Sequence, residues 1–133
     1  MLLTKASEYA LLSLVVISQQ EEPINVEKLS STLGISKSFL AKVLQSLARA
    51  DLLVSYKGAN GGFKLAREKN QITIYEIVSI VEDKVSVFEC TGKETACPSG
   101  NITFCAIWPV LIKLQSKIDV FLKELTLEDL IKD

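Results

Sequence analysis

The sequence predicts a mainly α-helical protein with a small β-hairpin wing, arranged as a winged helix-turn-helix followed by a long C-terminal helix. Three observations support this fold class. Two short segments with helical periodicity flank Gly34, a strand-turn-strand pattern follows them, and a longer periodic segment lies near the C-terminus. At 133 residues, 48% hydrophobic and 23% charged, the chain fits one globular domain.

Helix-capping residues mark the first two elements. Thr4 can cap a helix that runs to about Gln20, and the apolar residues within it recur at helical spacing. Asn25 can cap a second, short helix through Leu33. Gly34 then turns the chain, because glycine tolerates the positive φ at which many helices end.

A third helix is predicted between Ser36, its N-cap, and Ala50. Its core face recurs at positions i, i+3, i+4 and i+7, which are Leu40, Val43, Leu44 and Leu47. The opposite face is polar and basic and consists of Lys37, Ser38, Lys42, Gln45 and Arg49. A hydrophilic outer face on the second helix of a helix-turn-helix suits a helix that enters a DNA groove.

A hairpin is predicted directly after this helix. Residues 52–56 and 62–65 form two strand-like runs around a glycine-rich turn. Asn60 and Gly61 in that turn both tolerate the positive φ that a tight hairpin needs. In a winged helix-turn-helix this hairpin is the wing.

The C-terminal half combines a short helix, a loop and a long helix. Residues 75–81 predict the short helix, and 85–105 predict a loop because little periodicity remains there. From 106 to 125 the apolar residues alternate at spacings of three and four, which is typical of a helix packed on another helix. Pro109 belongs in the first helical turn, so the helix starts near Trp108. The apolar positions are Ile107, Val110, Leu111, Leu114, Ile118, Phe121, Leu122 and Leu125.

The distribution of charge points to nucleic acid. A formal net charge of -1 and a pI near 5.6 argue against binding over the whole surface. Residues 35–67, however, contain six basic residues and one acidic residue. Three side chains can exchange hydrogen bonds with bases or phosphates: Ser36, Ser38 and Gln45. Four can neutralise phosphates, namely Lys37, Lys42, Lys57 and Lys64, and Asn60 in the wing turn belongs to the same candidate surface.

These side chains also have purely structural interpretations. In that alternative Ser36 only caps its helix, Lys42 and Arg49 are only solvated, and Phe39 is part of the core. The corresponding alternative function is a winged-helix module for protein-protein assembly, whose basic region docks an acidic partner.

Three cysteines, Cys90, Cys97 and Cys105, lie in the predicted loop or at its end, separated by six and seven residues. Their odd number excludes a complete set of intramolecular disulfides, and in a reducing compartment such thiols bind metal or sense redox state. Thiolates hold iron-sulfur clusters well. Structural zinc usually takes four protein ligands, and the chain has neither a fourth cysteine nor a histidine. A cluster-free switch, in which a thiol oxidises, is the alternative.

Several stretches together resemble the IscR/NsrR (Rrf-two) family of winged-helix transcription regulators. They are MLLTKASEYALLSL at the start, residues 24–66 with their Gly-Gly-aromatic wing, the three-cysteine loop before a long helix, and the closing LTLEDL. The resemblance implies a homodimer that binds a near-palindromic double-stranded DNA operator. It also implies an iron-sulfur cluster, 2Fe-2S or 4Fe-4S, through which cluster supply, iron, nitric oxide or redox state is sensed.

By position, the resemblance implies DNA contacts from Ser36, Ser38, Phe39 and Lys57, and cluster ligation by Cys90, Cys97 and Cys105. Glu8 occupies the place from which some members supply a fourth ligand to the partner subunit's cluster. The alternative for Glu8 is a solvated carboxylate favoured by the helix dipole. The chain departs from many members because Lys57 replaces an arginine, Trp108 stands where some have a histidine, and the first two cysteines are farther apart.

The sequence therefore predicts a homodimeric, sequence-specific DNA-binding transcription regulator with three regions. These are a winged helix-turn-helix DNA-binding domain at 1–84, a cysteine-bearing sensor loop at 85–105, and a dimerisation helix with a C-terminal turn at 106–133. The apolar run 11–17 is far shorter than the ~20 residues of a membrane-spanning helix, so a cytoplasmic protein without membrane contact is expected. Without histidine, a phosphate-binding loop or a nucleophile-base pair, we expect no enzyme and no small-molecule substrate.

Overall fold

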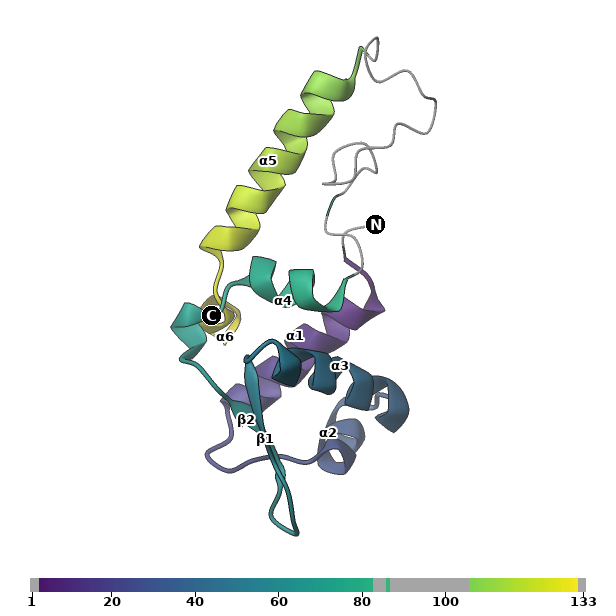
Figure 1. The fold of residues 1–133 in the computed structure, drawn as a ribbon, viewed down its shortest axis with the longest axis vertical. Coiled ribbons are helices and arrows are strands. Elements are labelled where there is room, and N and C mark those ends of the chain that lie inside the picture. The colour runs from purple at the N-terminus through teal and green to yellow at the C-terminus, as the bar shows by residue number, and fades with distance from the viewer. Residues whose placement is uncertain (1–2, 83–85, 87–105, 132–133) are drawn as a thin grey trace.

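The computed structural model describes residues 3–82, 86 and 106–131. Figure 1 shows the mainly helical fold with its two-stranded antiparallel hairpin, as the sequence predicts. In chain order the elements are α1 (Lys5–Ser18), α2 (Val26–Leu33), α3 (Lys37–Arg49), β1 (Leu53–Tyr56), β2 (Gly62–Leu65), the 3-10 turn η1 (Lys69–Gln71), α4 (Ile74–Val81), α5 (Trp108–Glu124) and α6 (Leu127–Ile131).

The predicted caps begin the first three helices. Thr4 Oγ1 accepts a hydrogen bond from the Ala6 amide at 3.2 Å, and Asn25 Oδ1 accepts one from the Lys28 amide at 2.8 Å. Ser36 caps α3 in the same way. Each such cap satisfies an amide that the helix itself leaves without a partner and contributes ~1 kcal/mol. Gly34 ends α2 at φ +68°, so the tight turn of the helix-turn-helix is confirmed.

The wing is held against the body by a close backbone approach. Ile24 and Phe63 exchange backbone hydrogen bonds of 3.1 and 2.8 Å, which attach β2 to the segment before α2. A Cβ on Gly62 would lie 2.4 Å from the carbonyl carbon and oxygen of Ile24, and Gly62 has φ +147°. A Cβ on Gly61 would lie 2.3 Å from the Tyr56 carbonyl oxygen. The Gly-Gly-aromatic sequence therefore permits a turn and a backbone contact that side chains would block. The hairpin is confirmed, but its positive φ angles lie at Gly58 and Gly62, so the expectation that Asn60 and Gly61 adopt them is wrong.

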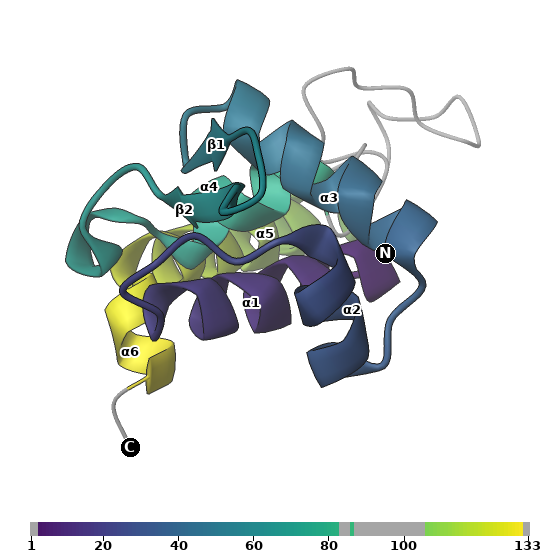
Figure 2. The same ribbon diagram turned by 90° about the horizontal axis from the view of Figure 1, so that it is seen from below.

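The core lies where α1, α3 and α4 meet. α1 contacts α2, α3, α4, α6 and β2, so it is the central element of the body. Figure 2 shows α1 running below α3 and the hairpin, with α6 near its C-terminal end. The predicted core face of α3 is confirmed, because Leu40, Val43, Leu44 and Leu47 are all buried. In α4, Ile77 and Val78 are buried, whereas Val81 is only half-buried.

The C-terminal end of α5 is anchored to this body. The Ile74 amide donates to the Leu125 carbonyl at 2.9 Å, and the Leu127 amide donates to the Ile72 carbonyl at 2.8 Å. Leu122 and Leu127 are buried in the core. From this anchor α5 extends away from the body, and its first turn and the wing tip lie at opposite ends of the molecule (Figure 1).

Much of the predicted apolar stripe of α5 is exposed. Val110 and Phe121 expose 66% and 60% of their surface, and Ile107 and Leu114 are exposed as well. The part of the chain that the structure describes therefore leaves this face of α5 without a packing partner. None of the helices in the described ranges has the length and apolar character needed to span a bilayer. The predicted region boundaries at 84/85 and 105/106 involve residues outside the described ranges and stay a prediction.

Candidate DNA-binding surface

The eight candidate DNA-binding residues are all exposed and lie in two places. The first is the N-terminal end of α3, and the second is the wing. Because the buried face of α3 packs on α1 and α4, its polar face is directed outward. The residues at the start of α3 are Ser36, Lys37, Ser38, Phe39 and Lys42, and those of the wing are Lys57, Asn60 and Lys64.

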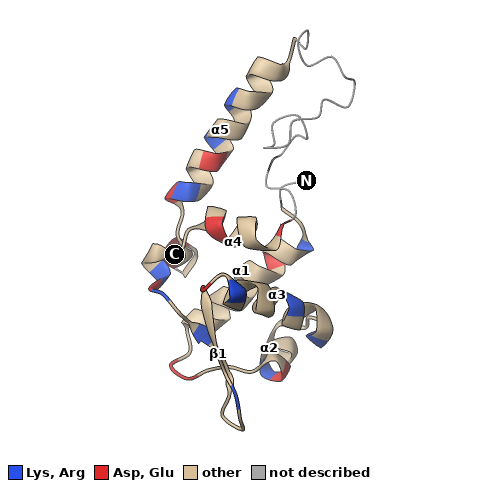
Figure 3. Ribbon diagram, in the orientation of Figure 1, with Lys and Arg blue, Asp and Glu red and all other residues tan. Residues whose placement is uncertain are grey.

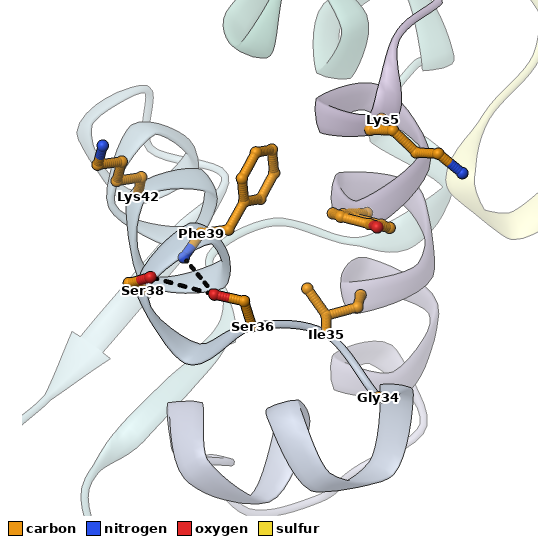
Figure 4. Close-up of a pocket in the computed structure, with 8 residues that line it drawn as sticks. Lys5, Gly34, Ile35, Ser36, Ser38, Phe39 and Lys42 are labelled. Carbon is orange, nitrogen blue, oxygen red and sulfur yellow. Dashed lines mark hydrogen bonds between the residues drawn. The ribbon is translucent and has the colours of Figure 1, made fainter.

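Two serine hydroxyls lie side by side where α3 begins. Ser36 Oγ accepts a hydrogen bond from the Phe39 amide at 3.4 Å and lies 3.1 Å from Ser38 Oγ. Figure 4 shows these two hydroxyls together, with the Phe39 ring in the space between α3 and α1. The capping interpretation of Ser36 is confirmed, and both hydroxyls are still on exposed residues that can reach a ligand.

The basic residues of α3 differ in their partners. Lys37 Nζ lies 2.7 Å from Glu27 Oε1, in a solvent-exposed ion pair that joins the two helices of the helix-turn-helix. The hydrogen bond from Lys37, followed by its charge, lowers the pKa of the Glu27 carboxyl. Lys42 has no carboxylate within ion-pairing distance among the described residues. Lys42 is therefore better placed than Lys37 to neutralise a phosphate.

The wing presents lysines beside exposed apolar side chains. In the hairpin Val54 pairs with Lys64 and Tyr56 pairs with Gly62, so these residues share one face. Val54, Tyr56 and Lys64 are exposed. Lys57 follows Tyr56 at the turn, and neither it nor Lys64 has a carboxylate within 4.0 Å in the described ranges. Figure 3 shows basic residues on α3 and along the hairpin.

A pocket joins α1 to the start of α3. It has a volume of about 420 Å³ and is lined by Lys5, Tyr9, Gly34, Ile35, Ser36, Ser38, Phe39 and Lys42. Tyr9 and Phe39 meet edge to face, with ring centroids 5.3 Å apart and an interplanar angle of 85°. In Figure 4 the Lys5 side chain extends away from Phe39. Lys5 and Tyr9 could not be assigned to this surface from the sequence, because no local pattern indicates which face of α1 meets α3.

A carboxylate at the end of α4 fixes the start of α1. Glu82 Oε1 accepts hydrogen bonds from the Thr4 amide at 2.9 Å, from Ser7 Oγ at 2.7 Å, and from the Thr4 hydroxyl. Burial raises the pKa of Glu82, but the hydrogen bonds from Thr4 and Ser7 outweigh it, and the pKa lies below its ordinary value. Ser7 is itself buried. The sequence alone does not indicate this role of Glu82, since its partners are more than 70 positions away.

The predicted cluster ligands are placed only in part. Cys90, Cys97 and Cys105 lie outside the described residues. Glu8 lies on the exposed surface of α1, where its carboxylate is 3.3 Å from Lys5 Nζ. Among the described residues there is no group of three or more His, Cys, Asp or Glu side chains that could hold a metal ion.

Comparison with known sequences gives one consistent family. A family model described as Rrf2, iron-dependent transcriptional regulator, matches residues 3–133. Protein aau3 of Rhizobium meliloti (strain 1021) is 32% identical over 134 residues, which cover 99% of this chain and 86% of that protein. The HTH-type transcriptional regulator IscR of Vibrio atlanticus (strain LGP32) is 31% identical over 135 residues, which cover 100% of this chain and 76% of that protein.

Solved structures share the fold. IscR of T. potens superposes with a TM-score of 0.77 at 24% identity, covering 100% of this chain and 88% of that chain. CymR (YrzC), the global cysteine regulator of B. subtilis, superposes with a TM-score of 0.74 at 24% identity, covering 98% and 96%. The predicted winged helix-turn-helix fold class is thereby confirmed.

Proposed function

The chain belongs to the Rrf2 family of transcriptional regulators, and we propose that it binds a near-palindromic operator as a homodimer, through the N-terminal end of α3 and the β1–β2 wing. Family membership makes it a DNA-binding transcription regulator and not an enzyme. Three points go beyond family membership and are proposals: which residues contact DNA, that the chain forms a homodimer, and which signal it senses.

The exposed start of α3 is the observation that carries the DNA-binding proposal. Four of its apolar residues are buried in the core, so the helix cannot turn its polar side inward without exposing them. Ser38 and Lys42 then face outward, and the wing adds Lys57 and Lys64. Hydroxyls and lysines in this arrangement suit the phosphates and base edges of a major groove.

The exposed apolar face of α5 supports a homodimer. Large side chains such as Val110, Leu114 and Phe121 recur along the helix and stay in solvent in the described part of one chain. A second copy of α5 would cover them, because the same face is self-complementary across a two-fold axis. Such a dimer would present two α3 helices, one to each half-site of the operator.

Selection of DNA tests this function. The full-length chain is incubated with a pool of random duplexes, and bound DNA is enriched and sequenced. We expect an inverted repeat whose half-sites are centred about one helical turn, ~34 Å, apart. A pool without an enriched motif, or equal binding to the selected and scrambled duplexes, would contradict the proposal and favour the protein-assembly alternative.

For the signal, we propose that Cys90, Cys97 and Cys105 hold an iron-sulfur cluster, with Glu8 of the partner subunit as fourth ligand. The donor set supports this: three thiolates bind such clusters, and the chain offers no histidine. Glu8 is exposed on the first helix, and it would have to leave its ion pair with Lys5. When bound, the cluster would supply iron and redox chemistry, while the surrounding residues bind and orient it.

Anaerobic reconstitution with iron and sulfide separates the cluster from the thiol switch. Visible absorption that disappears when all three cysteines become alanine is expected for the cluster. If no absorption develops and peroxide lowers the number of titratable thiols together with DNA affinity, the chain is a cluster-free thiol regulator of the same fold. Glu8→Gln is expected to weaken cluster retention while leaving DNA binding by the cluster-free form unchanged.

A further inference from the structure

Phe39 is an apolar ring within a polar surface. It is the third residue of α3, and its neighbours on the exposed side are Ser36, Ser38 and Lys42. The residue leaves 39% of its surface in solvent, although its neighbour in the sequence, Leu40, is fully buried. The interpretation of Phe39 as a core residue is therefore wrong for the exposed part of its ring, which is available to a ligand.

Tyr9 restrains the orientation of this ring. The two rings meet edge to face at 5.3 Å and 85°, an arrangement that aromatic pairs favour. Tyr9 is half-buried on α1, whereas Phe39 is exposed, so Tyr9 is the better-fixed member of the pair. The side of Phe39 that faces α1 is thus in contact with Tyr9, and the two serine hydroxyls line the same pocket as the ring.

We propose that Phe39 reads the C5 methyl group of a thymine in the major groove, and that Tyr9 is the positioning residue that holds the phenyl ring in place. This inference rests on the proposed DNA-binding function and names one base that the site recognises. A phenyl ring has no hydrogen-bonding group, so it cannot satisfy the donors and acceptors that the other base edges present in the groove. The thymine methyl is the apolar group there, and contact with phenylalanine removes both from water.

The test removes that methyl group alone. In the operator obtained by selection, each thymine is replaced in turn, in both half-sites, by uracil, which keeps every hydrogen-bonding group. Wild-type protein is expected to lose about fourfold in affinity per half-site at one symmetric position, the equivalent of one buried methyl group. No loss at any thymine, or an operator without thymine in the half-sites, overturns the proposal. A failed selection would refute DNA binding itself, so the two failures are distinguishable.

Protein variants identify the reader and its support. Phe39→Ala should bind thymine and uracil operators equally, and Tyr9→Phe, which keeps the ring, should discriminate as the wild type does. Tyr9→Ala should lose most of the discrimination, whereas Leu12→Ala, on the exposed side of the same helix, should keep it. Circular dichroism and the thermal midpoint confirm that each variant is folded. Full discrimination in Phe39→Ala would overturn the thymine contact, and full discrimination in folded Tyr9→Ala would overturn the positioning role.

Discussion

Gly62→Ala is the substitution whose consequence follows most directly from the geometry of the wing. The new Cβ would lie 2.4 Å from the carbonyl carbon and oxygen of Ile24, which are backbone atoms and cannot rotate away. The chain also has φ +147° at this position. Gly58, in the same hairpin, offers a matched control because it has φ +101° but nothing within 4 Å of its would-be Cβ.

The difference between the two variants isolates the steric contact. Placing alanine in a glycine-only backbone region costs ~1–3 kcal/mol, and both variants carry that cost. Gly62→Ala must in addition move β2 away from Ile24, which breaks the two backbone hydrogen bonds between Ile24 and Phe63. At ~1 kcal/mol each, their loss makes Gly62→Ala less stable than Gly58→Ala by about 2 kcal/mol.

Chemical and thermal unfolding measure this difference. For a chain of this size ~2 kcal/mol corresponds to a difference of about 8 °C in the thermal midpoint, with the midpoint in urea shifting in the same direction. Both variants are compared with the wild type under identical protein concentration, since a dimer is stabilised by mass action. Equal losses of stability for Gly62→Ala and Gly58→Ala would refute the close approach of the wing to Ile24.

Three further results are expected. Lys57→Ala should weaken operator binding and reduce the salt slope by about one per protomer, whereas Lys37→Ala should have a smaller effect because its ammonium is paired with Glu27; equal slopes would contradict this difference. Phe121→Asp should shift the mass measured by light scattering toward the monomer, and an unchanged mass would exclude this part of α5 from the interface. In the folded protein the pKa of the Glu82 carboxyl lies below its ordinary value of 4.5. The stability that this carboxylate contributes is therefore complete above pH 4.5 and is lost as the pH falls through the folded pKa. The stability gap between wild type and Glu82→Gln should therefore narrow on acidification, and a gap independent of pH would refute the role of the carboxylate.

Local features of this chain were predictable because each depends on residues close together in sequence. The side chains of Thr4, Asn25 and Ser36 accept hydrogen bonds from amides two or three positions ahead. Short sequence motifs therefore predict where α1, α2 and α3 begin. Gly34 determines the turn through its own backbone freedom. The buried face of α3 follows from helical periodicity alone. The same locality explains why the exposed residues of α3 and the wing were found from the sequence.

Contacts between distant segments were not predictable in the same way. The sequence shows that Glu82 is acidic and that Ser7 is polar, but the hydrogen bond between them spans 75 positions. The contact of Tyr9 with Phe39 likewise depends on how α1 crosses α3. For Gly62, the hairpin turn was predicted while the close approach to Ile24, which explains the glycine, was not. In each case the missing information is the relative placement of two helices or of a strand and a loop.

The first turns of α1 bring these distant contacts together. Successive side chains of an α-helix are rotated by about 100° around the helix axis, so those of Ser7, Glu8 and Tyr9 point in three different directions. Ser7 bonds Glu82 at the end of α4, Glu8 faces solvent beside Lys5, and Tyr9 supports Phe39 at the start of α3. Because the helix is stiff over so short a distance, these directions cannot change independently. The first two turns of α1 therefore fix both the position of the end of α4 and the orientation of the Phe39 ring, which we infer contacts DNA.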